Sequence, residues 1–109
     1  MTEDRHQVIQ DFDDVVNMIP KELKEWLETD ESWAVGQKDG GGESTGHQSG
    51  RRIVEIQCKE RSDYTDDDLD HMRKVTGYVK HHLRQKPQHG MEDFRWRYSL
   101  MNWGHDPLK

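Results

Sequence analysis

The 109-residue chain contains a single cysteine, Cys58, and no long apolar segment. One cysteine excludes a disulfide within the chain and is typical of proteins in a reducing compartment. A membrane-spanning helix needs about 20 consecutive apolar residues, and the sequence has neither such a run nor the layout of a signal peptide. These absences predict a protein that makes no use of a membrane and resides in the cytoplasm.

Branched aliphatic residues and phenylalanine are also scarce. Leu, Ile, Val and Phe account for 19 of the 109 residues, which is below the roughly 20% at which disorder becomes a concern. Trp, Tyr and Met add twelve bulky side chains, and the net charge of -6 is modest for this length. We therefore expect a single folded domain over residues 1–109, with a thin core.

The patterns of common catalytic and cofactor sites are missing. Ser99, His105 and Asp106 suggest a hydrolase triad, but the elbow G-x-S-x-G that such a serine needs is absent. No Lys-Ser or Lys-Thr follows the glycines to complete a nucleotide-binding loop. The aspartates of residues 63–70 lack the glycine and glutamate of a calcium loop, and no two histidines have i, i+4 spacing for zinc. We expect a non-enzymatic protein without metal or cofactor.

Apolar spacing predicts two helices in the N-terminal third. Residues 4–18 form the first, since four apolar residues fall on one stripe, namely Val8, Phe12, Val15 and Ile19. Pro20 suits the first turn of a second helix, "KELKEWLE". Three of its side chains should be buried: Leu23, Trp26 and Leu27. Residues 29–35 then resemble a turn or a frayed helix end.

The middle of the chain is less regular. Residues 37–50 contain five glycines, three of them consecutive, which predicts a flexible loop. Ser49 is a candidate cap for the segment that follows. Residues 51–59 show both helical spacing and strand-like alternation. We favour a helix, because a single strand would find no partner elsewhere in the chain.

Stronger signals mark two further helices. Thr65 is a natural N-cap, Asp68 completes a near capping box, and Pro87 ends a helix over residues 66–86. Its apolar arc consists of Leu69, Met72, Val75, Val79 and Leu83, and its basic arc of Arg73, Lys74, Lys80, His81 and Arg84, with Gly77 among them. After a loop at residues 87–92, Asp93 can cap a last helix that ends at a left-handed Gly104. The expected architecture is all-α, a small bundle of about five helices.

The last helix carries two apolar stripes. Phe94, Tyr98 and Met101 form one, and Trp96, Leu100 and Trp103 form the other. Aromatic residues between arginines can stack on single-stranded bases. Because this chain has few other large groups to bury, we instead expect the tryptophans to anchor the end of the chain.

Charge is unevenly distributed along the chain. Residues 1–33 hold ten acidic and three basic residues, a net charge of -7, whereas residues 71–109 hold eight basic and three acidic residues, a net charge of +5. Five of the seven histidines lie in the second region and could add positive charge near pH 6. Either the acidic start packs near the basic end, or the protein presents one basic face.

A basic face would favour weak nucleic-acid binding through phosphates, with DNA as the candidate partner. The candidate residues are Arg51, Arg52, Arg73, Lys74, Lys80, Arg84, Arg95 and Arg97. In a weaker form of this hypothesis, residues 49–52 at a helix start hold one backbone phosphate. The alternative function is a protein-interaction or homodimerisation module that uses the acidic first helix or an exposed part of the Trp-rich end.

Three segments carry a resemblance to a known family. "SGRRIVEI", "YTDDDLDHMRKVTGYVKHHL" and "WRYSLMNWGHDP" resemble a bacterial domain family of unknown function. The resemblance extends from "IPKELKEWLE" to the C-terminus. Some members of that family are labelled DNA-binding protein, without an assigned site, so the resemblance implies nucleic-acid binding but no functional residues.

Overall fold

A computed structural model of the chain describes residues 5–35, 45–85 and 91–108, and the side chains of the last range from residue 95 onward. Within these ranges it contains six α-helices, one short 3-10 turn and no strand. The helices are α1 (Arg5–Val15), α2 (Pro20–Leu27), α3 (Asp30–Ala34), α4 (Thr45–Gln57), α5 (Asp66–Leu83) and α6 (Met91–Asn102), and the turn is Arg61–Asp63. The predicted all-α fold is confirmed, with one helix more than expected.

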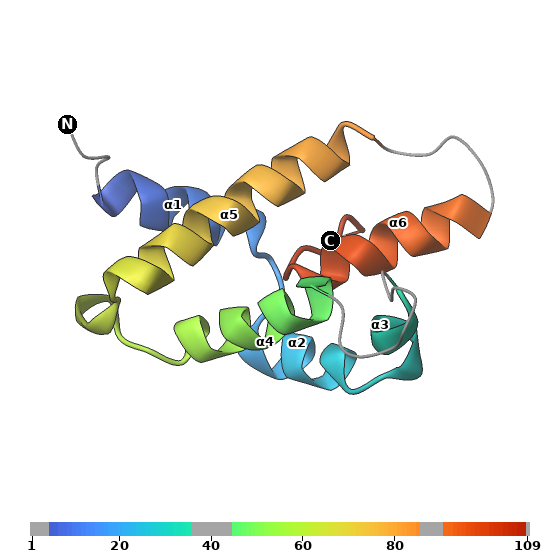
Figure 1. Ribbon diagram of the computed structural model, residues 1–109, viewed down its shortest axis with the longest axis horizontal. Coiled ribbons are helices and arrows are strands. Elements are labelled where there is room, and N and C mark those ends of the chain that lie inside the picture. Colours follow the sequence, from blue (N-terminus) through green and yellow to red (C-terminus); the bar gives the residue numbers. More distant parts are fainter. Residues whose placement is uncertain (1–4, 36–44, 86–90, 109) are drawn as a thin grey trace.

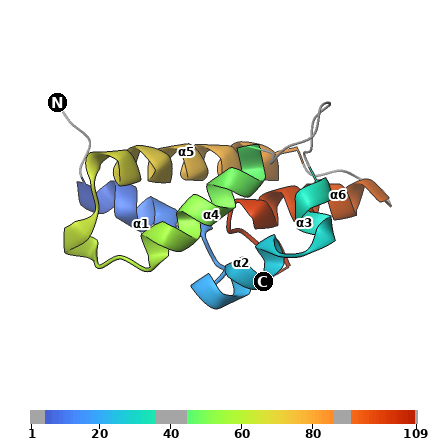
Figure 2. The ribbon, with the colours of Figure 1, turned by 60° about the horizontal axis from the view of Figure 1, so that its bottom comes forward.

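The helices form two groups that share one core. α1 packs against α5, while α2, α3 and α6 pack around one another and α4 joins them through α2 and α6 (Figure 1). In the rotated view, α5 runs along the top, α2 lies at the bottom, and α4 passes between them (Figure 2). Ile53 and Ile56 of α4 are fully buried and belong to this shared core.

α5 begins where the sequence predicts. The Thr65 hydroxyl accepts a hydrogen bond from the Asp68 backbone N–H at 3.1 Å, and the Asp68 carboxylate accepts one from the Thr65 N–H at 3.0 Å. This capping box satisfies two backbone donors that a helix start leaves without partners. The expected apolar arc is buried from Leu69 to Val79, but Leu83 is exposed.

The first two helices differ from expectation at their junction. Val8, Phe12 and Val15 are buried as predicted. Ile19 is 60% exposed, so its predicted place on the same stripe is wrong. Since α1 ends at Val15, the chain turns before Ile19, which becomes the N-cap of α2. The core is completed instead by Ile9 and Met18, and α2 buries Leu23 and Leu27 and half-buries Trp26.

Two predicted irregular segments are partly helical. Residues 30–34 form α3, because the Thr29 hydroxyl accepts a hydrogen bond from the Ser32 N–H and caps the helix. Of the predicted loop over residues 37–50, residues 37–44 lie outside the described residues, and residues 45–50 belong to α4. Ser49 is therefore not a cap but a buried residue within the helix. Residues 51–57 continue α4, which confirms helix over strand.

Close packing between helices explains why a glycine, Gly50, lies inside α4. A Cβ atom at this position would lie 2.5 Å from the Asn102 carbonyl oxygen and 2.6 Å from a Leu27 methyl group. Both distances are shorter than real Cβ contacts, so α4 approaches α6 and α2 this closely only where no side chain intervenes. Here the glycine serves helix packing and not a turn.

α6 begins earlier than the sequence predicts but ends as predicted. It starts at Met91, so Asp93 lies inside the helix and is not its N-cap. At its other end Gly104 has a φ of 81°, as predicted for a left-handed residue. The His105 N–H donates to the Leu100 carbonyl at 3.0 Å and the Gly104 N–H to the Met101 carbonyl at 2.9 Å. These two bonds form a Schellman motif, which satisfies carbonyls at the helix end.

The C-terminal segment is tied to the start of the chain. His105 Nδ1 donates to the Val15 carbonyl at 2.6 Å, and the Asp106 N–H donates to Asn17 Oδ1 at 2.7 Å. Trp103 is only 4% exposed. The expected anchoring of the Trp-rich end is therefore confirmed. Of its predicted stripes, Phe94 lies outside the described side chains.

Candidate functional site

The later turns of α5 carry several exposed basic side chains. After Asp70 the helix contains no acidic residue, and Lys80, His81 and Arg84 are exposed. The start of α6 lies against this end, because the Trp96 indole N–H donates to the His82 carbonyl at 2.8 Å. Arg95, next to Trp96 in the chain, is also exposed. We call Lys80, Arg84 and Arg95 the basic end.

Two predicted nucleic-acid contacts, Arg52 and Arg97, instead form ion pairs with carboxylates of the protein. Arg52 Nη2 lies 2.7 Å from the carboxylate of Asp68, which is 1% exposed. Arg97 forms two hydrogen bonds of 3.2 Å with Asp106. Because a buried carboxylate is costly without a partner, these arginines stabilise the fold.

Asp68 also binds Lys59, whose Nζ lies 2.7 Å away. Burial alone would raise the pKa of Asp68. The hydrogen bonds from Lys59, the Thr65 N–H and Arg52 outweigh burial and hold the pKa well below its usual range. Asp68 is therefore charged at neutral pH, and it connects α4 and Lys59 to the start of α5.

Two further predicted contacts, Arg73 and Lys74, lie close to acidic side chains. Arg73 is paired with Asp70 on the same helix and lines a shallow hollow with Asp11 of α1. Lys74 lines another hollow with Asp67 and Asp70. The acidic start of the chain therefore packs beside part of α5, through α1. This is one of the two arrangements that the uneven charge distribution predicts.

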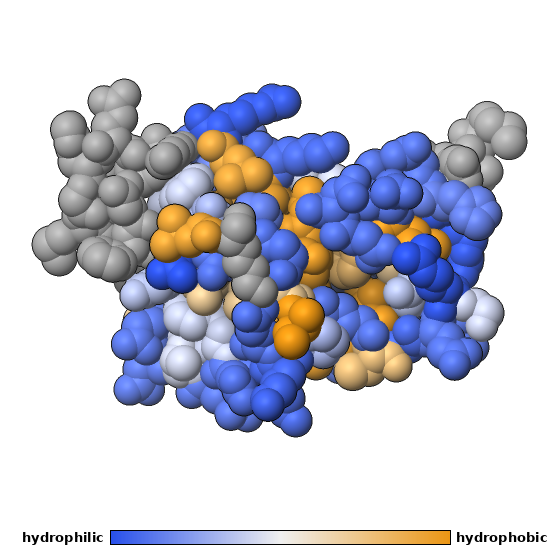
Figure 3. All heavy atoms as spheres, turned by 180° about the vertical axis from the view of Figure 1, so that it is seen from behind, coloured by the Kyte–Doolittle hydropathy of each residue, from blue (hydrophilic) through white to orange (hydrophobic). Residues whose placement is uncertain are grey.

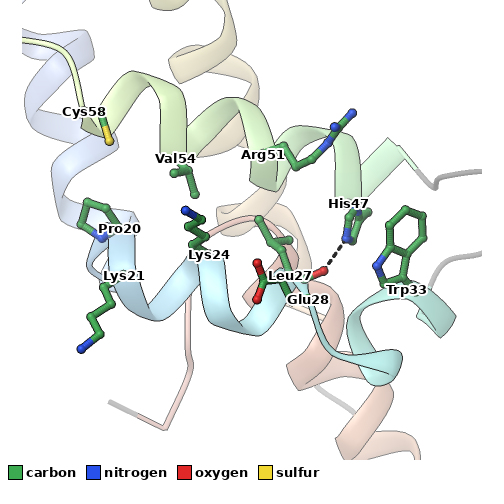
Figure 4. A pocket seen from close by; sticks show the side chains of 10 residues that line it. All are labelled: Pro20, Lys21, Lys24, Leu27, Glu28, Trp33, His47, Arg51, Val54 and Cys58. Atoms are coloured by element: carbon green, nitrogen blue, oxygen red, sulfur yellow. Dashed lines mark hydrogen bonds between the residues drawn. The ribbon is translucent and has the colours of Figure 1, made fainter.

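Arg51 faces a different part of the molecule. It lines a cavity between α2 and α4 together with Lys21, Lys24 and Glu28 (Figure 4). Lys21 and Lys24 were not among the predicted residues, because they lie in a segment whose overall charge is acidic. The only signal was their spacing of three residues, which places both on one side of a helix.

The phosphate site expected at residues 49–52 is wrong, since α4 begins at Thr45 and not near Ser49. The Ser49 hydroxyl is 3% exposed and lies 2.9 Å from His71 Nε2. A serine beside a histidine resembles part of a catalytic pair. Here the hydroxyl is enclosed by the helices and has no room for a substrate.

Two histidines carry less charge than expected near pH 6. Burial, with Arg52 and Lys74 nearby, lowers the pKa of His71 below its ordinary value. Burial and the neighbouring His81 lower the pKa of His82 as well. Each imidazole therefore adds less positive charge to α5 at mildly acidic pH than a histidine with an ordinary pKa would.

Two structural features are absent from the described ranges. Among the residues that the structure describes, no group of three His, Cys, Asp or Glu side chains could hold a metal ion. No helix in these ranges is long and apolar enough to cross a membrane.

Comparison with known proteins places the chain in a family. Residues 11–101 match the model of a family described as "Protein of unknown function (DUF3140)". No curated protein and no solved structure matches the chain. The match extends from the middle of α1 to the end of α6, so it includes the basic end and the α2–α4 cavity. The chain therefore belongs to the DUF3140 family of proteins of unknown function.

Proposed function

We propose that this protein binds nucleic acid weakly and without sequence preference, through phosphate contacts made at the basic end. The observation that supports this proposal is that Lys80 and Arg84, exposed on the last turns of α5, belong to the part of α5 that α6 contacts through Trp96, next to the exposed Arg95. Among the described residues, none of these three forms an ion pair. Their charges are therefore available to phosphates.

The rest of the surface limits the affinity. The whole chain has a net charge of -6, so a phosphate backbone is repelled except where it meets the basic end. Contacts to phosphates fix position but carry no base sequence. DNA is the expected ligand, and binding should depend on salt more than on sequence.

Fluorescence anisotropy with labelled duplex and single-stranded DNA tests the proposal. For about three phosphate contacts, affinity should fall roughly 40-fold between about 50 and 200 mM salt. The double variant Lys80→Glu/Arg84→Glu should lose binding at the lower salt. Lys21→Glu/Lys24→Glu makes the same charge change on α2 and is the matched control.

Two results would overturn the proposal. One is the absence of binding at the lower salt. The other is an equal loss of binding in both double variants, which would show that only the net charge of the protein matters.

A protein-interaction or homodimerisation module is the second candidate. Trp33 is 43% exposed, which leaves a large aromatic side chain on the surface of α3. The Trp-rich C-terminal end is not such a surface, because Trp103 is buried and the Trp96 N–H is bonded to α5. Seen from behind, the apolar surface is broken into separate patches among hydrophilic side chains (Figure 3). A partner of limited contact area suits these patches better than an extensive dimer interface.

A further inference from the structure

A cavity of about 650 Å³ opens between α2 and α4 (Figure 4). Its volume lies within the range of about 300–1,000 Å³ that is typical of small-molecule sites. The walls are mainly apolar and consist of Pro20, Leu27, Trp33, Val54 and Cys58. An apolar body of small-molecule size would therefore fit between the two helices.

The rim of the cavity is positively charged. Lys21, Lys24 and Arg51 lie around it, with Glu28 as the one carboxylate among the lining residues. Lys24 extends from α2 toward Val54 on α4, whereas Lys21 points away from the cavity (Figure 4). A single ammonium group thus reaches over the apolar floor, where an anion would lie within its field.

The Trp33 end of the cavity is held in place by the fold. His47 is 2% exposed, and its Nε2 donates to the Leu27 carbonyl at 2.7 Å. The Trp33 ring packs on the imidazole with a centroid distance of 4.0 Å. Nearby, the Trp26 indole N–H is bonded to the buried Asn102. Because these walls are fixed before binding, a ligand need not order them.

We propose that this cavity binds a soluble organic carboxylate with an apolar body. The carboxylate lies at Lys24, and the apolar body packs on Leu27, Val54 and Trp33. Charge complementarity selects an anion over a neutral or cationic molecule with the same tail. The proposal does not depend on nucleic-acid binding, since no residue of the basic end lines the cavity.

Calorimetric titration of the full chain with decanoate, decanol and decyltrimethylammonium tests this assignment. Decanoate should bind to one saturable site, decanol more weakly, and the cation least of all. Lys24→Glu should weaken decanoate binding at least tenfold, which corresponds to about 1.4 kcal/mol, because a charge-assisted contact is replaced by repulsion. Val54→Trp, which fills the cavity, should weaken it at least as much. Lys80→Glu makes the same charge reversal outside the cavity and should leave binding unchanged.

A second readout uses the single cysteine. Cys58 lines the cavity and is exposed, so saturating decanoate should slow its alkylation by iodoacetamide. Protection of Cys58 keeps the test decisive if Val54→Trp fails to fold. The proposal would be overturned if all three head groups bound equally well, or if neither Lys24→Glu nor Val54→Trp weakened decanoate binding. Binding to anionic phospholipid vesicles without binding to decanoate would overturn it in favour of a membrane surface.

Discussion

Asp68 joins α4, α5 and the segment between them through one buried carboxylate. It accepts hydrogen bonds from Arg52, Lys59 and the Thr65 N–H. Because these bonds lower its pKa on folding, they stabilise the protein at every pH above the unfolded-state pKa of about 3.9. That stabilisation is lost as the pH falls below this value.

Asp68→Asn should therefore reduce the free energy of unfolding at pH 7 by about 2–3 kcal/mol, the range for lost hydrogen bonds to a charged group. Urea denaturation measures this loss. Asp70→Asn removes an exposed partner of Arg73 on the same helix, and should cost no more than about 0.5 kcal/mol. A similar loss in both variants would show that burial of the Asp68 carboxylate has no special weight.

The lowered pKa of His71 predicts how the stability of the folded protein responds to mild acid. Burial lowers its folded-state pKa below the ordinary value, so the folded protein resists protonation that the unfolded chain accepts. Stability is therefore full above the unfolded-state pKa of about 6.5 and declines as the pH falls below it. Urea denaturation from pH 7.5 to 5 should show this decline, and His71→Gln should reduce it. A slope that changes more with the exposed His81→Gln would contradict this assignment.

At the scale of elements, two glycines in helices have opposite roles. Gly50 lies where α4 meets α6 and α2, whereas Gly77 on α5 has no atom within 4 Å of the position a Cβ would take. Gly77→Ala should stabilise the protein by up to about 1 kcal/mol, through helix propensity alone. Gly50→Ala should destabilise it by about 1–3 kcal/mol, because the helices must separate. Thermal denaturation of the pair distinguishes them, and a gain in both would contradict the close packing of α4.

Helices with local signals were predicted well. The Thr65 hydroxyl and the Asp68 carboxylate act within one turn, and the apolar arc from Leu69 to Val79 needs only helical periodicity. α3 and the start of α4 were missed for a different reason. Five residues are too few for a periodic pattern, and glycines before Arg51 resemble a loop when their packing partners are unknown.

At the scale of the whole molecule, the two proposed surfaces lie on separate helices. The basic end belongs to α5 and α6, and the cavity to α2, α3 and α4. Lys80→Glu/Arg84→Glu should therefore abolish DNA binding and retain decanoate binding, whereas Lys24→Glu should do the reverse. This outcome would show that the protein has two separate local sites, and it would exclude a single effect of the protein's net charge.

Of the eight basic residues proposed from the sequence, Lys80, Arg84 and Arg95 are exposed and form no ion pair among the described residues. Arg52 and Arg97 were indistinguishable from them in the sequence, because their carboxylate partners lie 16 and 9 residues away. Arg51 lines the cavity between α2 and α4, which no local pattern indicates. Burial and pairing over such separations depend on how the helices pack.

The sequence by itself determined the all-α class, the buried stripes of α1, α2 and α5, and the left-handed end at Gly104. Each depends on the backbone within a few residues, where periodicity, capping and φ preference act directly. Tertiary structure alone decided which cations remain exposed, that Gly50 is a packing residue, and that α2 and α4 enclose a cavity. These features arise from contacts between segments far apart in the chain, for which the order of residues carries no local signal.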